Sequence, residues 1–104
     1  MTFEEQLELA YAESHCAFSY EKALQVFCYY FYTFEQYSRR KHPRLSTAKL
    51  TELLDRIDGD GLFTAEDYPV MIEAYFNTKF NCDRNICHFF SGQIRELRFY
   101  EKCY

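Results

Sequence analysis

The sequence contains no tryptophan and very little glycine or proline, with three Gly and two Pro in 104 residues. Nearly half of the residues, 48%, are hydrophobic, and this composition excludes a disordered or low-complexity chain. A chain of this length can bury roughly two-thirds of its unfolded surface in one core. We therefore expect a single domain over residues 1–104.

Two further absences concern location. No apolar run approaches the ~20 residues that a membrane helix requires. Residues 1–5 include two glutamates where an export signal would be basic. The sequence therefore predicts a cytoplasmic protein that makes no membrane contact.

The sequence also lacks the short motifs of common enzymes. Neither Gly-x-Ser-x-Gly, nor a phosphate-binding glycine loop, nor His-Glu-x-x-His occurs in it. The three histidines stand in unrelated sequence contexts, so no sequence motif pairs a nucleophile with a base, although spatial adjacency cannot be read from the sequence. We expect no catalytic residues and no cofactor.

The five cysteines have neither the regular spacing of a disulfide framework nor a Cys-x-x-Cys pair. Structural zinc needs four ligands, usually with one pair two to four residues apart. A zinc site that includes His15 or His88 is an alternative, but free thiols packed in the core fit the sequence better. The cysteines are Cys16, Cys28, Cys82, Cys87 and Cys103.

Capping residues and apolar spacing predict two helices in the first 40 residues. Thr2 and Glu5 have the spacing of a capping box, which starts a helix that runs to about Ser14. Ser19 starts a second helix that runs to about Arg40 and is about 33 Å long. The second helix is the expected centre of the fold.

Helical signals continue in the second half of the chain. Ser46 starts a third helix, which ends where the sequence Asp-Gly-Asp-Gly favours a turn. Thr64 and Asp67 are the two candidate caps of a fourth helix, and Asp67 is favoured because Pro69 fits only a first turn. The remaining segment is expected to be helical, although residues 93–101 are also compatible with a short strand. These elements predict an all-α bundle of about five helices around the long second helix.

Charge is zoned along the chain, whose net charge is −4. Residues 1–36 carry six acids against one Lys, and residues 51–75 carry seven acids against one Arg. Residues 37–50 instead carry five basic residues and no acid. We therefore expect two acidic surface sectors and one basic corner.

Residues 45–80 resemble an EF-hand, because a capped helix, an Asp-Gly-Asp-Gly turn, Phe63 and an acidic helix start follow in that order. The resemblance implies a loop in which alternate oxygen ligands surround Ca²⁺. In this register Arg56 takes the first loop position, and Asp55 takes it if one residue is inserted. The alternative is a plain connection whose aspartates end one helix and start the next. The implied Ca²⁺ ligands are Asp55, Asp58, Asp60 and Asp67.

A basic run joins the second and third helices, and such a run can release counterions from nucleic acid. We favour another interpretation, in which its cations offset the dipole at the end of the second helix and Pro43 stops that helix. The acidic sectors on either side would repel a long duplex, so nucleic acid is the less favoured partner. The cations are Arg39, Arg40, Lys41 and Arg44.

Tyrosines on the second helix indicate a protein contact. Tyr29, Tyr32 and Gln36 fall opposite the predicted core stripe, and Tyr offers a large rigid contact area at low entropic cost. In the alternative, other helices cover this one on several sides. Val26, Tyr30 and Tyr37 form one flank, and the predicted core stripe is Tyr20, Ala23, Leu24, Phe27, Phe31, Phe34 and Ser38.

Zoned acidity, surface tyrosines and missing enzyme motifs together predict a non-catalytic protein that binds a basic surface of another protein. A small acidic chain of this kind resembles phage and mobile-element antagonists such as anti-CRISPR proteins. That resemblance implies inhibition of a nucleic-acid-handling protein. A Ca²⁺-binding protein and a nucleic-acid binder that uses the basic run are the alternatives. The predicted contact residues are Tyr29, Tyr32, Gln36, Glu52, Asp55, Asp58, Asp60, Glu66 and Asp67.

Overall fold

A computed structural model describes residues 1–57, 63–79 and 82–91 of the chain. The helices and the absence of strands in these residues confirm the predicted all-α fold. The choice between helix and strand for residues 93–101 lies outside the described residues. The helices are α1 (Phe3–Glu13), α2 (Tyr20–Ser38), α3 (Thr47–Arg56), α4 (Asp67–Asn77) and α5 (Ile86–Phe89).

The first three helices begin at the predicted caps. The Thr2 hydroxyl accepts a hydrogen bond from the Glu5 N–H, and the Glu5 carboxylate accepts one from the Thr2 N–H, both at 3.1 Å. Ser19 and Ser46 each accept a hydrogen bond from the backbone N–H three residues later. These side chains satisfy N–H groups that the helix itself leaves unpaired, which is why the starts were visible in the sequence.

The predicted cap of α4 is wrong. Asp67 is the first helical residue, and Glu66 precedes it without a capping side-chain hydrogen bond. The Asp67 carboxylate instead reaches back to the Thr64 N–H at 2.7 Å and to the Thr64 hydroxyl at 3.2 Å. Asp67 therefore closes the turn that leads into the helix, and Pro69 lies in the first turn as expected.

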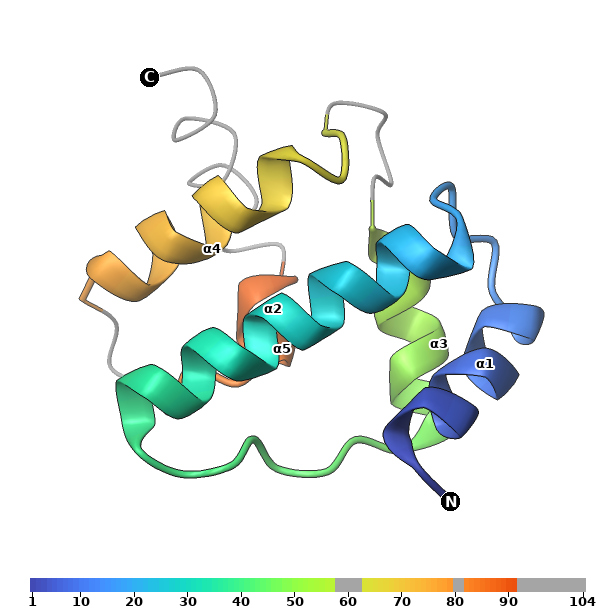
Figure 1. Cartoon of the computed structure of the whole chain (residues 1–104), viewed down its shortest axis with the longest axis horizontal. Coiled ribbons are helices and arrows are strands. Elements are labelled where there is room, and N and C mark those ends of the chain that lie inside the picture. Colours follow the sequence, from blue (N-terminus) through green and yellow to red (C-terminus); the bar gives the residue numbers. More distant parts are fainter. Residues whose placement is uncertain (58–62, 80–81, 92–104) are drawn as a thin grey trace.

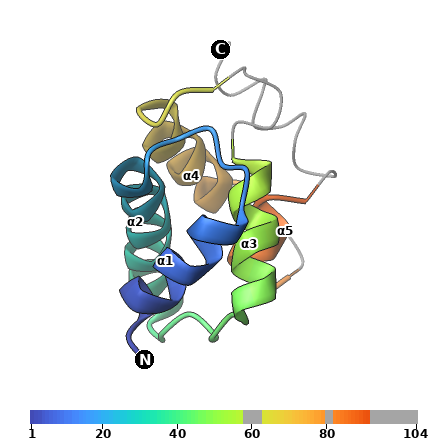
Figure 2. The ribbon, with the colours of Figure 1, turned by 90° about the vertical axis from the view of Figure 1, so that its right-hand side faces the viewer.

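The helices pack in two pairs. α1 packs mainly against α3 and α2 against α4, with a smaller contact between α1 and α2. Figure 1 shows α2 across the front, with α4 above it, α1 and α3 at one end, and α5 behind. Seen from that end in Figure 2, α1 lies between α2 and α3. The two pairs share one core, to which every described helix contributes.

The buried stripe of α2 differs from the predicted stripe: it is shifted around the helix axis toward α4. Val26 and Tyr30, which were expected on a flank, are 4% and 0% exposed. Tyr30 lies against the rings of Phe76 in α4 and Phe89 in α5, with centroids 5.2 and 5.3 Å apart. Part of the predicted stripe is only half-buried, because α4 and α5 approach from one side. The buried residues of α2 are Ala23, Val26, Phe27, Tyr30 and Phe34.

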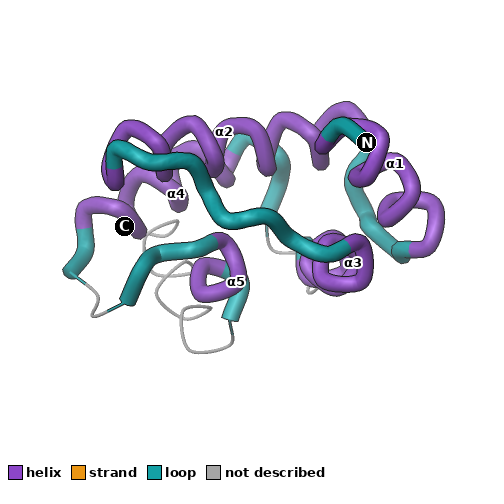
Figure 3. Tube along the Cα trace, turned by 90° about the horizontal axis from the view of Figure 1, so that it is seen from below, coloured by secondary structure: helices purple, strands orange, loops and turns teal. Residues whose placement is uncertain are grey.

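The linker from α2 to α3 crosses below the bundle, as Figure 3 shows from that side. α2 ends at Ser38, and Arg39 caps it in the left-handed conformation with φ 62°, so the helix stops before Pro43 is reached. His42 anchors the middle of the linker. Its ring packs against Phe34 with a centroid separation of 4.7 Å, and its Nε2 accepts a hydrogen bond from the Ile86 N–H at 2.9 Å.

No described helix has both the length and the apolar character needed to cross a membrane.

Candidate functional site

Two recesses lie between α2 and α4, and these two helices carry three of the five exposed large hydrophobic side chains in the described part of the chain. Tyr32, Tyr37 and Val70 are 62%, 54% and 59% exposed, and only Met1 and Leu9 are comparable among the described large hydrophobic residues. Exposed aromatic and apolar groups that gather on one face mark contact surfaces. We define the α2/α4 face by Gln25, Tyr29, Tyr32, Gln36 and Tyr37 of α2 and Pro69, Val70, Glu73 and Asn77 of α4.

A hydrogen bond holds the two helices of this face together. The Tyr29 hydroxyl donates to the Glu73 carboxylate at 2.6 Å. This hydrogen bond, together with burial, raises the pKa of Tyr29, so the phenol keeps its proton at neutral pH. The hydrogen bond links Tyr29, which lines one recess of the face, to Glu73, which lines another.

The two recesses are hollows of different size. One has a volume of about 210 Å³ and runs from Gln25 to Pro69. The other has a volume of about 410 Å³ and is lined by Gln36, Tyr37 and Phe76 among others. Tyr37 is held at its edge between the Phe76 ring, 5.4 Å away, and the Arg84 guanidinium, 4.7 Å away. The face is therefore an uneven surface with two recesses that side chains of a partner can fill.

The fold brings together only some of the predicted contact residues. Tyr29, Tyr32 and Gln36 share the α2/α4 face, with Tyr29 half-buried and the other two exposed. Glu66 is exposed just before α4, where it adds a carboxylate to the end of this face. Asp67 is held by Thr64, and Asp58 and Asp60 lie outside the described residues.

Two predicted acids lie elsewhere, on α3. Glu52 forms ion pairs with Lys49 at 3.0 Å and with Arg56 at 3.4 Å. Asp55 accepts a hydrogen bond from the His15 N–H at 2.6 Å, which ties α3 to the loop after α1. These carboxylates therefore stabilise the α1/α3 end of the molecule.

Val70 and Glu73 were not predicted as members of the face. Both follow Glu66 at helical spacing, four and seven residues on, and this spacing is the signal that places them on one side of α4. Their proximity to Tyr29 could not be read from the sequence, since 44 residues separate Tyr29 from Glu73.

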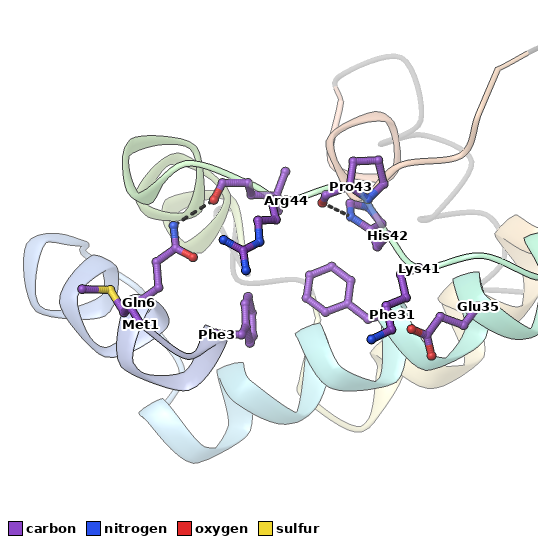
Figure 4. A pocket seen from close by; sticks show the side chains of 10 residues that line it. Met1, Phe3, Gln6, Phe31, Glu35, Lys41, His42, Pro43 and Arg44 are labelled. Atoms are coloured by element: carbon purple, nitrogen blue, oxygen red, sulfur yellow. Dashed lines mark hydrogen bonds between the residues drawn. The ribbon is translucent and has the colours of Figure 1, made fainter.

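The basic run spreads its cations over the linker. Arg39 caps α2, and the Arg40 guanidinium covers the Phe34 ring at 5.7 Å. Lys41 and Arg44 point into a pocket of about 230 Å³ (Figure 4). Within the described residues neither of these two forms an ion pair. The four side chains therefore face several directions and do not form a single stripe.

The walls of this pocket are aromatic. Phe3 and Phe31 meet edge to face with centroids 5.1 Å apart, and the His42 ring lies 4.8 Å from Phe31 (Figure 4). Gln6 closes one end, where its amide donates to the Leu45 carbonyl at 2.8 Å. The pocket lies between the start of α1, α2 and the linker, as its lining residues in Figure 4 show.

Metal sites have little support in the described part of the chain. No group of three His, Cys, Asp or Glu side chains there is placed to hold a metal ion. Two of the implied Ca²⁺ ligands, Asp55 and Asp67, already accept hydrogen bonds from backbone N–H groups. The other two, Asp58 and Asp60, are outside the described residues, so the calcium site stays a prediction.

The prediction that most cysteines pack in the core is wrong for Cys28 and Cys82, whereas Cys16 and Cys87 pack against the core from its edge. Cys28 and Cys82 are exposed, and Cys16 and Cys87 are partly buried. No disulfide joins any two of these four. The spacing of cysteines in the sequence says nothing about depth, and the core here is filled by aromatic rings instead.

Comparisons with protein-family models, with curated proteins and with solved structures found no match. The function is therefore argued from the residues of this chain, and the α2/α4 face is the strongest candidate for a contact site.

Proposed function

We propose that this protein is a non-catalytic binding module whose α2/α4 face docks on another protein that presents a basic surface. The observation that carries the proposal is that Tyr32, Tyr37 and Val70 are exposed on α2 and α4, the two helices that the Tyr29–Glu73 hydrogen bond joins. Large aromatic residues in such positions supply most of the energy of protein interfaces.

Charge argues for a basic partner. Glu66 and Glu73 are exposed on the α4 side of the face, while Lys22 lines one hollow and the buried Arg84 guanidinium stacks on Tyr37 at the other. The chain as a whole has a net charge of −4. Complementary charge speeds association with a basic partner and disfavours an acidic one. The attraction between the two surfaces weakens as the salt concentration rises.

The finer proposal concerns what the partner does. Basic grooves that hold phosphates are typical of nucleic-acid-handling proteins. A small acidic protein that covers such a groove inhibits the enzyme it binds, as the resemblance to anti-CRISPR antagonists implies. The expected site of action is the cytoplasm. The linker that carries the basic run passes on the opposite side of α2 from α4 (Figure 1), away from this contact.

Paired charge variants test the contribution of the acids. The partner is first captured from an extract of the native host and purified, and its affinity is then measured by calorimetry. Glu66→Gln with Glu73→Gln should weaken binding about tenfold at low salt, because it removes two carboxylates from the face. The new amide at position 73 keeps an oxygen that can accept the Tyr29 hydrogen bond, so the face itself should stay intact.

The matched control is Glu4→Gln with Glu8→Gln, which removes the same charge from exposed positions of α1. It should change the affinity less than twofold, as a rough guide. Equal losses for the two pairs would mean that only net charge matters, and the α2/α4 face would lose its role. A second copy of this chain is the other occupant to consider. Sedimentation experiments without the partner test this alternative. If the wild type forms dimers and Tyr32→Ala does not, the α2/α4 face joins two copies of this chain, and the proposal of another protein as partner is overturned.

A further inference from the structure

Three titratable side chains meet at a point that the proposed function does not use. The Tyr75 hydroxyl lies 2.6 Å from His88 Nδ1, and Cys82 Sγ lies 3.4 Å from the same nitrogen. Tyr75 comes from α4, His88 from α5, and Cys82 from the segment between them. A thiol, an imidazole and a phenol that the sequence separates are thus brought into hydrogen-bonding range.

The Cys82 thiol is exposed to solvent, and the His88 imidazole beside it is half-buried. Cys82 is exposed, His88 is half-buried, and Tyr75 is 1% exposed. Burial raises the pKa of Tyr75, so its hydroxyl remains a neutral partner of the imidazole at neutral pH. A reagent can therefore reach the sulfur, while the Tyr75 hydroxyl contacts the same imidazole nitrogen, Nδ1, from within the core.

A buried cation adds to the local field. Arg84 is 6% exposed, and its guanidinium donates to the Tyr75 carbonyl at 3.0 Å and lies 5.8 Å from the Tyr75 ring centroid. An imidazolium favours the thiolate of a cysteine that it contacts, and reactive cysteines are found where such a partner and solvent access coincide.

We propose that Cys82 is a nucleophilic thiol that forms covalent adducts with small uncharged carbon electrophiles, with His88 as its base. The Tyr75 hydroxyl shares Nδ1 and turns from donor to acceptor in this step: the thiol proton passes to His88 Nδ1, whose N–H then donates to the Tyr75 oxygen, and from there it is lost to solvent. The thiolate sulfur attacks the carbon, an S–C bond forms, and the bond from carbon to the leaving group breaks, with its electron pair leaving on that group. No oxidant or metal is required.

The other described cysteines provide internal controls. Cys28 is also an exposed residue. Partial burial of its thiol group and the nearby Glu4 carboxylate nevertheless raise the pKa of that thiol. Burial also raises the pKa of Cys87. The proposal therefore predicts selectivity for one thiol within a single protein.

Iodoacetamide is the probe, because alkylation replaces its iodide in one step. The full chain is treated near neutral pH and digested with trypsin, which cuts after Lys and Arg and leaves each of the five cysteines in a separate peptide. Cys82 falls in residues 80–84 and Cys87 in residues 85–95. Mass spectrometry should show Cys82 alkylated about tenfold faster than Cys28. Equal rates for Cys82 and Cys28 would overturn the proposal.

Two further measurements separate the base from simple accessibility. His88→Gln should reduce the Cys82 rate to that of Cys28 and flatten its dependence on pH, while the Cys28 rate stays unchanged. A Cys82 rate that survives this substitution would also overturn the proposal. In urea, where the wild-type fold is lost, the rate ratio of the two thiols should fall to about one. A ratio that persists in urea would show that local sequence, and not the His88 contact, sets the reactivity.

Discussion

At the scale of single residues, His42 shows how a side chain from the basic run serves the fold. Its Nε2 accepts the Ile86 N–H at 2.9 Å, and its Nδ1 lies 2.7 Å from the Pro43 carbonyl, to which an N–H at that position donates. Both contacts are satisfied by the neutral ring. Burial lowers the pKa of His42, although the Pro43 carbonyl and Asp83 act in the opposite direction. The folded protein therefore favours the uncharged imidazole.

This preference predicts a pH dependence of stability. A histidine whose pKa is lower in the folded state than in the unfolded state stabilises the fold. Its full contribution to the free energy of unfolding is present above the unfolded pKa of about 6.5. That contribution is lost as pH falls from about 6.5 toward the lower folded value, since protonation fills the Nε2 lone pair and breaks the bond from Ile86. Urea unfolding at several pH values should show a smaller acid loss in His42→Gln than in the wild type. If the free energy of unfolding fell equally with pH in the two proteins, protonation of His42 would not be the cause of the acid loss.

At the scale of elements, the helix starts that depend on neighbouring residues could be predicted, and the packing could not. Thr2, Ser19 and Ser46 cap their helices as expected, because each bond spans three residues. The rotation of α2 that buries Tyr30 depends on α4 and α5, which come 30 or more residues later. Asp67 was assigned to the right turn but to the wrong role, since cap and first-turn acids have similar sequence signals.

The cap of α3 gives a stability prediction at this scale. Ser46→Ala removes the acceptor of the Lys49 N–H, whose hydrogen bond measures 3.1 Å, and should lower the free energy of unfolding by about 1 kcal/mol. Ser46→Asp keeps an acceptor at the same position and should remain close to the wild type. Urea unfolding monitored by circular dichroism measures both. If the two variants lost equal stability, the hydrogen bond would not be the reason for the loss.

At the scale of the whole molecule, folding rearranges the charge zones of the sequence. The acidic sector of residues 51–75 is divided, since Glu52 and Asp55 lie on α3 while Glu66 and Glu73 lie at α4. The candidate face is therefore built from residues that the sequence places in different zones. Tyr29, Tyr32 and Gln36 were predictable from the period of α2, but their neighbours on α4 required the fold.

The most direct test of the central claim compares two exposed apolar residues. Tyr32 is 62% exposed on the α2/α4 face, and Leu9 is 53% exposed on α1, so neither substitution by Ala should disturb the core. The measurement is the dissociation constant for the partner captured from the native host. Tyr32→Ala should weaken binding about ten- to thirtyfold, or about 1.4–2 kcal/mol, and Leu9→Ala should change it less than about twofold. Equal affinities for wild type and Tyr32→Ala, or a larger loss for Leu9→Ala, would contradict the assignment of the α2/α4 face.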